Sequence, residues 1–165
     1  QSKLDFVRAL HGAGAARALV ADLGLPELEP AGWYPFEVYD NLLRQIAARF
    51  YGGDLERLYD VGTFSAEHAL TTTFRAVADT GDVVGLIQRF GAVHQRSYSE
   101  GFAAVLPDPE ERLIAVHLAD APAYSEADLW VAAGFYAGAV QLMGFSDASC
   151  RFTLAADGGH LVLTW

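Results

Sequence analysis

Five histidines are the side chains of this sequence best suited to binding a metal. They are His11, His68, His94, His117 and His160, and no two of them have the four-residue spacing of a zinc-binding helix. The spacing therefore predicts no metal site. Surface or structural roles are favoured for all five, since single histidines carry little specificity. His94 and His68 are the two that we consider as alternatives for a haem or a metal.

Cys150 is the single cysteine, so it has no partner for a disulfide or a zinc site, which fits a reducing, cytoplasmic compartment. A thiolate nucleophile needs a cationic neighbour or a helix start. In a strand, Cys150 shares one face with Ala148, Phe152 and Leu154, while Arg151 points to the other face. We expect Cys150 to pack as a small hydrophobic residue.

No motif indicates an enzyme. Gly12 and Gly14 lack the third glycine of a dinucleotide-binding loop, because Arg17 stands there, and no strand precedes them. A serine nucleophile elbow, a phosphate-binding loop and a spaced pair of catalytic acids are also missing from the sequence. The chain is therefore predicted to be non-enzymatic.

Composition favours one domain over residues 1–165, with 52% hydrophobic and 19% charged residues. The net charge of −10 disfavours binding to nucleic acid and to anionic membranes. The longest apolar stretch, LWVAAGFYAGAV, is shorter than the ~20 residues of a membrane-spanning helix. We expect no membrane span.

The first half of the chain has helical periodicity. Residues 1–32 form a helical N-terminal extension that Gly12 and Gly14 interrupt. Apolar residues recur at three- and four-residue steps through WYPFEVYDNLLRQIAARFYGG. A further helix follows Asp54, with a break near Gly62, and another spans TGDVVGLIQRFG with Gly91 as its stop.

The period then changes to two. YSEGFAAVL and RLIAVHL flank a turn and predict one hairpin, and ASCRFTL and HLVLTW predict a second. Between them Ser125 caps a helix that ends at Gly144. This order predicts an α+β fold, in which a helical layer packs on an antiparallel sheet built from two hairpins with a helix between them.

Several runs resemble a known superfamily: GWYPFEVYDNLLRQIAARFYGGD, LYDVG, GFYAGAVQLMGFSDASCRFTL and the terminal LTW. They are similar to the 4-vinyl-reductase-like bacterial ligand-binding domains, which are related in fold to haem-nitric-oxide-binding domains and to sensory domains of aromatic-responsive regulators. The chain looks most like a bacterial family of unknown function with the same WYP-type helix start and closing tryptophan. The resemblance covers nearly the whole chain from Trp33 onward. It implies a pocket between the helices and the sheet, often in a dimer. Members of the superfamily are commonly sensory or scaffolding modules.

The resemblance also bears on cofactors. Some relatives bind a metal through several cysteines, one of which matches Cys150. This sequence lacks the other cysteines. The haem-binding branch has a tyrosine-x-serine-x-arginine signature, whereas here Tyr98 is followed by Glu100 and no arginine. We therefore expect no cofactor, with haem at His94 or His68 as the alternative.

The predicted function is a small-molecule-binding or sensory module in bacterial signalling. Its apolar or aromatic ligand would lie among Trp33, Tyr39, Phe90, His94, Tyr98, Trp130 and Tyr136. The alternative is a protein-interaction or scaffolding module that dimerises or docks a partner without a ligand.

A homodimer is expected because the helix from Ser125 to Gly144 is apolar or small on nearly every side. One stripe of this helix should face its own sheet. The residues expected at the dimer interface are Trp130, Gly134, Ala137 and Gly138.

Overall fold

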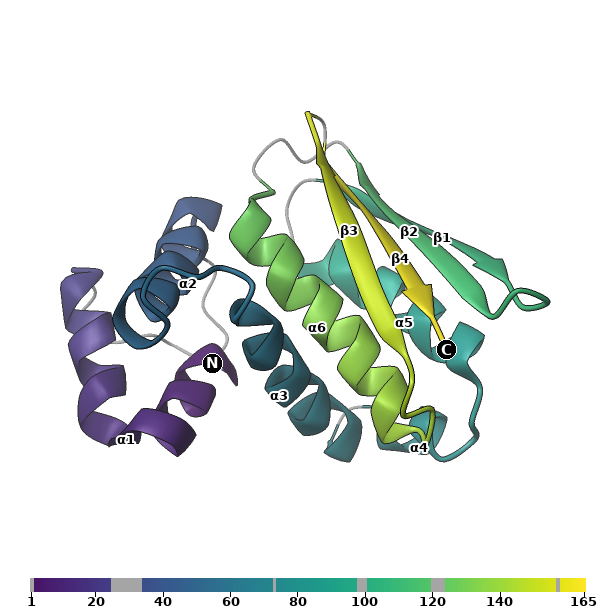
Figure 1. Cartoon of the computed structure of the whole chain (residues 1–165), viewed down its shortest axis with the longest axis horizontal. Helices are drawn as coiled ribbons and strands as arrows, with labels where there is room; N and C mark the ends of the chain where they lie inside the picture. The colour runs from purple at the N-terminus through teal and green to yellow at the C-terminus, as the bar shows by residue number, and fades with distance from the viewer. Residues whose placement is uncertain (1, 25–33, 73, 98–100, 120–123, 157) are drawn as a thin grey trace.

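The computed structural model describes residues 2–24, 34–72, 74–97, 101–119, 124–156 and 158–165 (Figure 1). The helices are α1 (Ser2–Asp22), α2 (Phe36–Phe50), α3 (Leu58–Thr71), α4 (Arg75–Ala78), α5 (Val83–Ser97) and α6 (Glu126–Leu142). The strands are β1 (Phe102–Asp108), β2 (Leu113–Ala119), β3 (Ser149–Ala155) and β4 (Gly158–Thr164).

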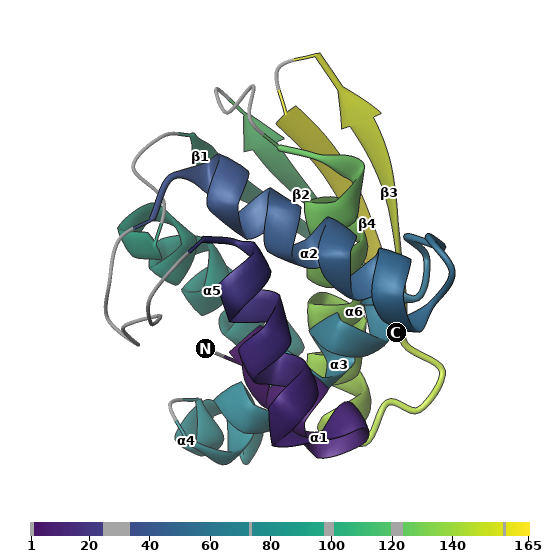
Figure 2. The same ribbon diagram turned by 90° about the vertical axis from the view of Figure 1, so that its left-hand side faces the viewer.

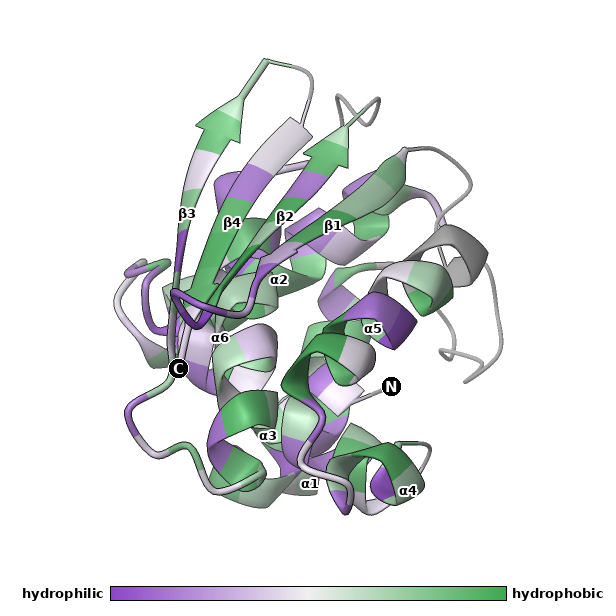
Figure 3. Ribbon diagram, turned by 90° about the vertical axis from the view of Figure 1, so that its right-hand side faces the viewer, coloured by the Kyte–Doolittle hydropathy of each residue, from purple (hydrophilic) through white to green (hydrophobic). Residues whose placement is uncertain are grey.

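The four strands form one antiparallel sheet in the order β1-β2-β4-β3. Each predicted hairpin is present, and β2 pairs with β4 to join the two, as Figure 3 shows. Alternate residues of β2 and β4 are buried against the helices, which is the cause of the period-two pattern. The predicted α+β fold, with α6 between the hairpins, is confirmed.

The described helices all lie on one face of the sheet. In Figure 1, α6 lies directly beside the sheet, α3 lies on the other side of α6, and α1 and α2 lie farthest from the strands. Figure 2 shows α1 and α2 in front of these inner helices. Leu4, Phe6 and Val7 of α1 are buried, so this segment belongs to the packed structure. No helix in the described ranges is long and apolar enough to cross a membrane.

α6 begins as the sequence predicts. The Ser125 side chain accepts a hydrogen bond from the backbone N–H of Asp128 at 3.2 Å and so caps the helix. The face of α6 that includes Leu129 packs on the sheet, where the Leu129 side chain lies close to the backbone of Gly159.

The opposite face of α6 packs against α3 at backbone distance. A Cβ atom added to Gly134 would lie 2.0 Å from the carbonyl oxygen of Tyr59, and one added to Gly62 would lie 2.1 Å from that of Val131. Such distances are too short for any side chain, so both positions require glycine. α3 therefore occupies the space beside the small residues of α6.

This packing corrects the predicted dimer interface. Ala137 is fully buried, and a Cβ atom at Gly138 would meet Thr63 of α3 at 3.0 Å. Gly134 contacts α3 as well, and the Trp130 ring packs edge-on against Phe152 of β3 at 4.8 Å. Gly134 and Gly138, which we expected a second copy to cover, are covered by α3, and the Trp130 ring packs on β3. A homodimer stays a prediction, but these four residues no longer support it.

Glycines also explain two errors in the helix boundaries. α3 runs through Gly62 without the predicted break, and α5 continues past Gly91 to Ser97. At Gly91 an added Cβ would lie 3.0 Å from the Val105 side chain, so this glycine lets α5 approach β1. By contrast, Gly12 does bend α1, with a φ of 86° that favours glycine.

Cys150 lies in β3 with 6% of its surface exposed, and burial raises its pKa to about 12. The thiol therefore stays protonated at neutral pH, as inert packing requires.

Adding one methyl group at Gly134 should destabilise the protein, because it forces α3 and α6 apart. We expect Gly134→Ala to lower the free energy of unfolding by about 1–3 kcal/mol, the usual cost of overpacking. Urea denaturation of both proteins measures this difference. Gly14→Ala is the matched control, since its Cβ meets nothing within 4 Å in α1. The same change there should be neutral or slightly stabilising. Equal effects at the two sites would contradict the close helix contact.

Candidate functional site

A pocket of about 300 Å³ lies between the helices and the inner face of β2. Four helices, α1, α2, α5 and α6, contribute to it, together with β2 and with residues just before α4 and α6. The pocket therefore lies where the N-terminal helices meet the rest of the fold. Its lining consists of Lys3, Tyr39, Phe74, Phe90, Val93, Leu118, Tyr124, Asp128, Val131, Ala132, Phe135 and Tyr136.

One wall of the pocket is aromatic. The ring of Phe90 on α5 packs against three other aromatic rings. The distances between ring centroids are 4.9 Å to Phe74, 4.8 Å to Phe135 and 6.0 Å to Tyr136. Edge-to-face and tilted pairs at these distances are favourable. This wall suits a flat, apolar ligand.

The other end of the pocket is polar. Asp128 of α6 is only 3% exposed, and Tyr39 of α2 forms a side-chain hydrogen bond with its carboxylate. Lys3 of α1 interacts electrostatically with Asp128, and its ammonium lies 5.9 Å from the centre of the Tyr39 ring. Three helices thus bring a cation, a hydroxyl and a carboxylate to one place.

Burial dominates the titration of these groups. It raises the pKa of Asp128 to about 6, although the hydrogen bond from Tyr39 and the charge on Lys3 act in the opposite direction. Burial also lowers the pKa of Lys3, against the attraction of Asp128. The pKa values of Tyr124 and Tyr136 rise, mainly through burial. A polar group of a ligand could exchange hydrogen bonds with this cluster.

Three of the predicted pocket residues, Tyr39, Phe90 and Tyr136, line the cavity. Trp130 does not, because its ring is turned toward β3. Trp33 and Tyr98 lie outside the described residues. His94 is described only by its place in α5, four residues after Phe90 and directly after Val93.

Sequence reasoning missed the polar end. Asp128 was predicted only as part of a helix-capping motif, and Lys3 only as part of the helical N-terminal extension. Only the high apolar content around Asp128 in α6 could have indicated a buried carboxylate.

A metal site of the usual kind is not formed by the described residues, in which no three His, Cys, Asp or Glu side chains come together. His68 lies exposed on α3 and is not part of the described pocket lining, which argues against it as a haem ligand.

The fold is similar to that of H-NOX domains. An H-NOX protein from S. oneidensis in the Fe(II)NO state matches with a TM-score of 0.69 and 17% identity, over 99% of this chain and 97% of that one. An oxygen-binding H-NOX domain related to soluble guanylate cyclases matches with a TM-score of 0.72 and 10% identity, over 99% and 90%. A structure from work on haem distortion in the H-NOX family has a TM-score of 0.70, 10% identity and coverages of 99% and 91%. No family model and no curated protein matches the sequence.

These matches support the haem-nitric-oxide-binding part of the resemblance and not its 4-vinyl-reductase-like part. The prediction that the chain is not an enzyme stays a prediction, because matches of 10–17% identity show the fold alone. The prediction of no cofactor is contradicted, because structures with this fold are described by their haem and its ligands. Together these comparisons establish that the chain has the H-NOX fold.

The buried carboxylate should make stability depend on pH in an unusual direction. The pKa of Asp128 is about 6 in the folded state against 3.8 as its ordinary value, so between these pH values the folded state binds more protons than the unfolded state. Its contribution to stability is therefore complete below about pH 3.8 and falls as pH rises to about 6. In Asp128→Asn this loss disappears, and its stability relative to wild type should rise by up to about 3 kcal/mol between pH 4 and pH 7.

Urea denaturation across this pH range measures the difference. Asp147→Asn is the control, because Asp147 is exposed. It should show no comparable rise. A constant difference between Asp128→Asn and wild type would contradict a buried, proton-binding Asp128.

Proposed function

We propose that this chain is a sensory module of bacterial signalling that binds a small molecule in the pocket, with haem as its cofactor. The proposal rests on one coincidence. The chain has the H-NOX fold over 99% of its length, and that fold encloses an aromatic pocket here. When bound, haem supplies an iron that takes up a diatomic gas, as in the NO and oxygen complexes of the matched proteins.

Few side chains in the pocket can bind the haem iron, which limits how haem could be held. Haem iron in proteins is bound by His, Cys, Met or Tyr. Of these types, the described lining contains only tyrosines. Burial raises the pKa of Tyr124 and Tyr136, which disfavours tyrosinate at the iron, and Tyr39 is engaged with Asp128.

His94 is therefore the residue that we assign to the iron. It follows Val93, which lines the pocket, and lies about one helical turn beyond Phe90 on α5. The cavity volume is at the lower end of the ~300–1,000 Å³ range for small-ligand pockets. Lys3 and Tyr39 would bind the polar edge of the ligand, and the phenylalanines would exclude water from its apolar face.

Haem titration tests this proposal. Wild-type protein should bind one equivalent of haem, seen as a sharp Soret absorption band that shifts when carbon monoxide is added to the reduced protein. His94→Ala should weaken haem binding by about tenfold or more, since even loss of a supporting partner of a metal ligand costs that much. His68→Ala, an exposed histidine on α3, is the control and should bind as wild type does.

If wild type binds no haem, the cofactor assignment is wrong. If His94→Ala and His68→Ala bind haem equally, the assignment of the iron ligand is wrong.

The alternative is a protein-interaction module without a ligand. It is supported by the side of the sheet on which none of the described helices lies. We call this side the outer face. Leu106, Ala115 and Val162 lie side by side across it, and Leu106 and Val162 are 53% and 39% exposed. Exposed apolar patches often mark protein contacts. A wild type that binds neither haem nor apolar aromatic compounds would favour this alternative.

A further inference from the structure

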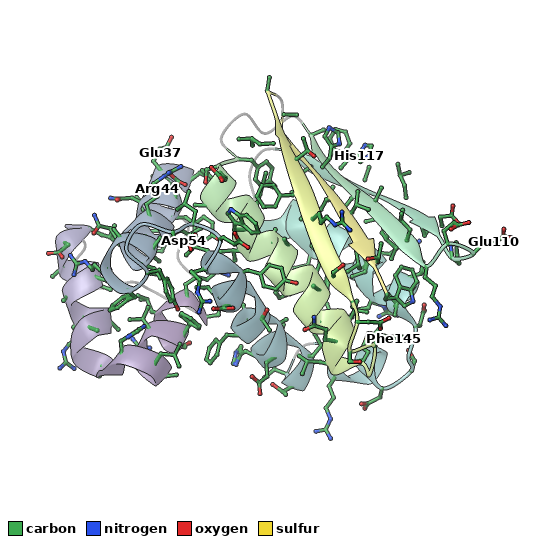
Figure 4. The ribbon with its side chains drawn as sticks, viewed as in Figure 1. Glu37, Arg44, Asp54, Glu110, His117 and Phe145 are labelled. Carbon is green, nitrogen blue, oxygen red and sulfur yellow. The ribbon has the colours of Figure 1, made fainter. Side chains whose placement is uncertain are left out.

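Two histidines face each other on the outer face. His117 of β2 and His160 of β4 are directly opposite in the antiparallel register. Their ring centroids are 4.5 Å apart and the ring planes are nearly perpendicular, at 88°. Figure 4 shows His117 on the side of the sheet away from the helices. The pocket lies on the other side, so the two histidines belong to a separate site.

The surroundings of this histidine pair are open. One row across the sheet contains Ala104 of β1, the two histidines and Thr153 of β3. Ala104 adds only a methyl group beside His117, and Thr153 adds a hydroxyl beside His160. His117 is half-buried and His160 is exposed. Among the described residues, each of the two rings packs against the other. Both side chains are therefore free to turn their ring nitrogens outward.

We infer that His117 and His160 form a binding site for a late first-row divalent metal ion, with Cu²⁺ bound more tightly than Zn²⁺. Imidazole nitrogen is a preferred ligand of both ions, and their affinities follow the Irving–Williams order. Opposite residues of an antiparallel pair have Cβ atoms about 4.5–5.5 Å apart, which lets two imidazoles reach one ion at the usual metal–nitrogen distance of about 2.0–2.1 Å.

The rest of the coordination is water, with the Thr153 hydroxyl beside it. No third His, Cys, Asp or Glu side chain joins the pair among the described residues. Two protein ligands with water make an exchangeable site, in contrast to the closed four-ligand sites that stabilise small zinc domains. Arg151 lies two residues from Thr153 on the same face of β3 and adds positive charge, which further limits the affinity.

A purely structural reading makes a different prediction. Two aromatic rings across neighbouring strands stabilise a sheet by contact alone. In that case, replacing either ring would change stability in the same way with or without metal ions. A dependence of stability on metal ions therefore distinguishes a metal-binding site from a purely structural ring contact.

The test is isothermal titration of the full chain, without added haem, with Cu²⁺, Zn²⁺ and Mg²⁺. Wild type should bind one equivalent of Cu²⁺ and of Zn²⁺ but no Mg²⁺, which prefers oxygen ligands. His160→Ala and His117→Ala should each lower the affinity for Cu²⁺ about tenfold or more. His160 is exposed, so its replacement leaves the fold intact.

A thermal melt supplies the second readout. Zn²⁺ should raise the melting temperature of wild type by mass action and have little effect on His160→Ala. His68→Ala and His94→Ala should bind Cu²⁺ as wild type does, which also keeps this site distinct from haem binding. If wild type and His160→Ala bind Cu²⁺ equally, or if Mg²⁺ gives the same melting shift as Zn²⁺, the inference is overturned.

Discussion

The contact between α3 and α6 is the constraint on which the rest of the structure depends. Gly62 and Gly134 bring the two backbones together, and the Thr63 hydroxyl donates to the Gly134 carbonyl oxygen at 3.3 Å. Small residues allow this approach, because a Cβ atom at either glycine would collide with the backbone of the other helix. With α3 on one side and the sheet on the other, most residues of α6 are buried. This explains why it is apolar on nearly every side.

The pocket follows from the same arrangement. α6 supplies five of its described lining residues, and α1, α2 and α5 close the space around it. Because α6 is so enclosed, Asp128 in its first turn is buried even though its backbone N–H takes part in an ordinary helix cap. A buried carboxylate is costly unless it is paired. Tyr39 and Lys3 reduce that cost and connect the N-terminal helices to α6.

The sequence predicted the features that depend on local pattern. The strands and the Ser125 cap were found because period-two burial and capping involve neighbouring residues only. The roles of the glycines were harder to predict, because a glycine can end a helix or let a neighbouring backbone approach. Gly62 and Gly91 were predicted to end helices, whereas each lets a neighbouring element approach. Gly134 and Gly138 were predicted at a dimer interface, whereas they contact α3 of the same chain. The pairing of Lys3 with Asp128 spans most of the chain and leaves no local signal.

The α3–α6 contact also sets the order in which this chain can fold. Thr63 and Gly134 are 71 residues apart, so their hydrogen bond closes a long loop whose entropy must be lost before any packing energy is gained. Contacts of such sequence separation slow folding. During synthesis α2 and α3 leave the ribosome before α6, against which both pack. The apolar surface that they bury against α6 therefore stays exposed until α6 has emerged, which makes this interval the period of greatest risk of aggregation.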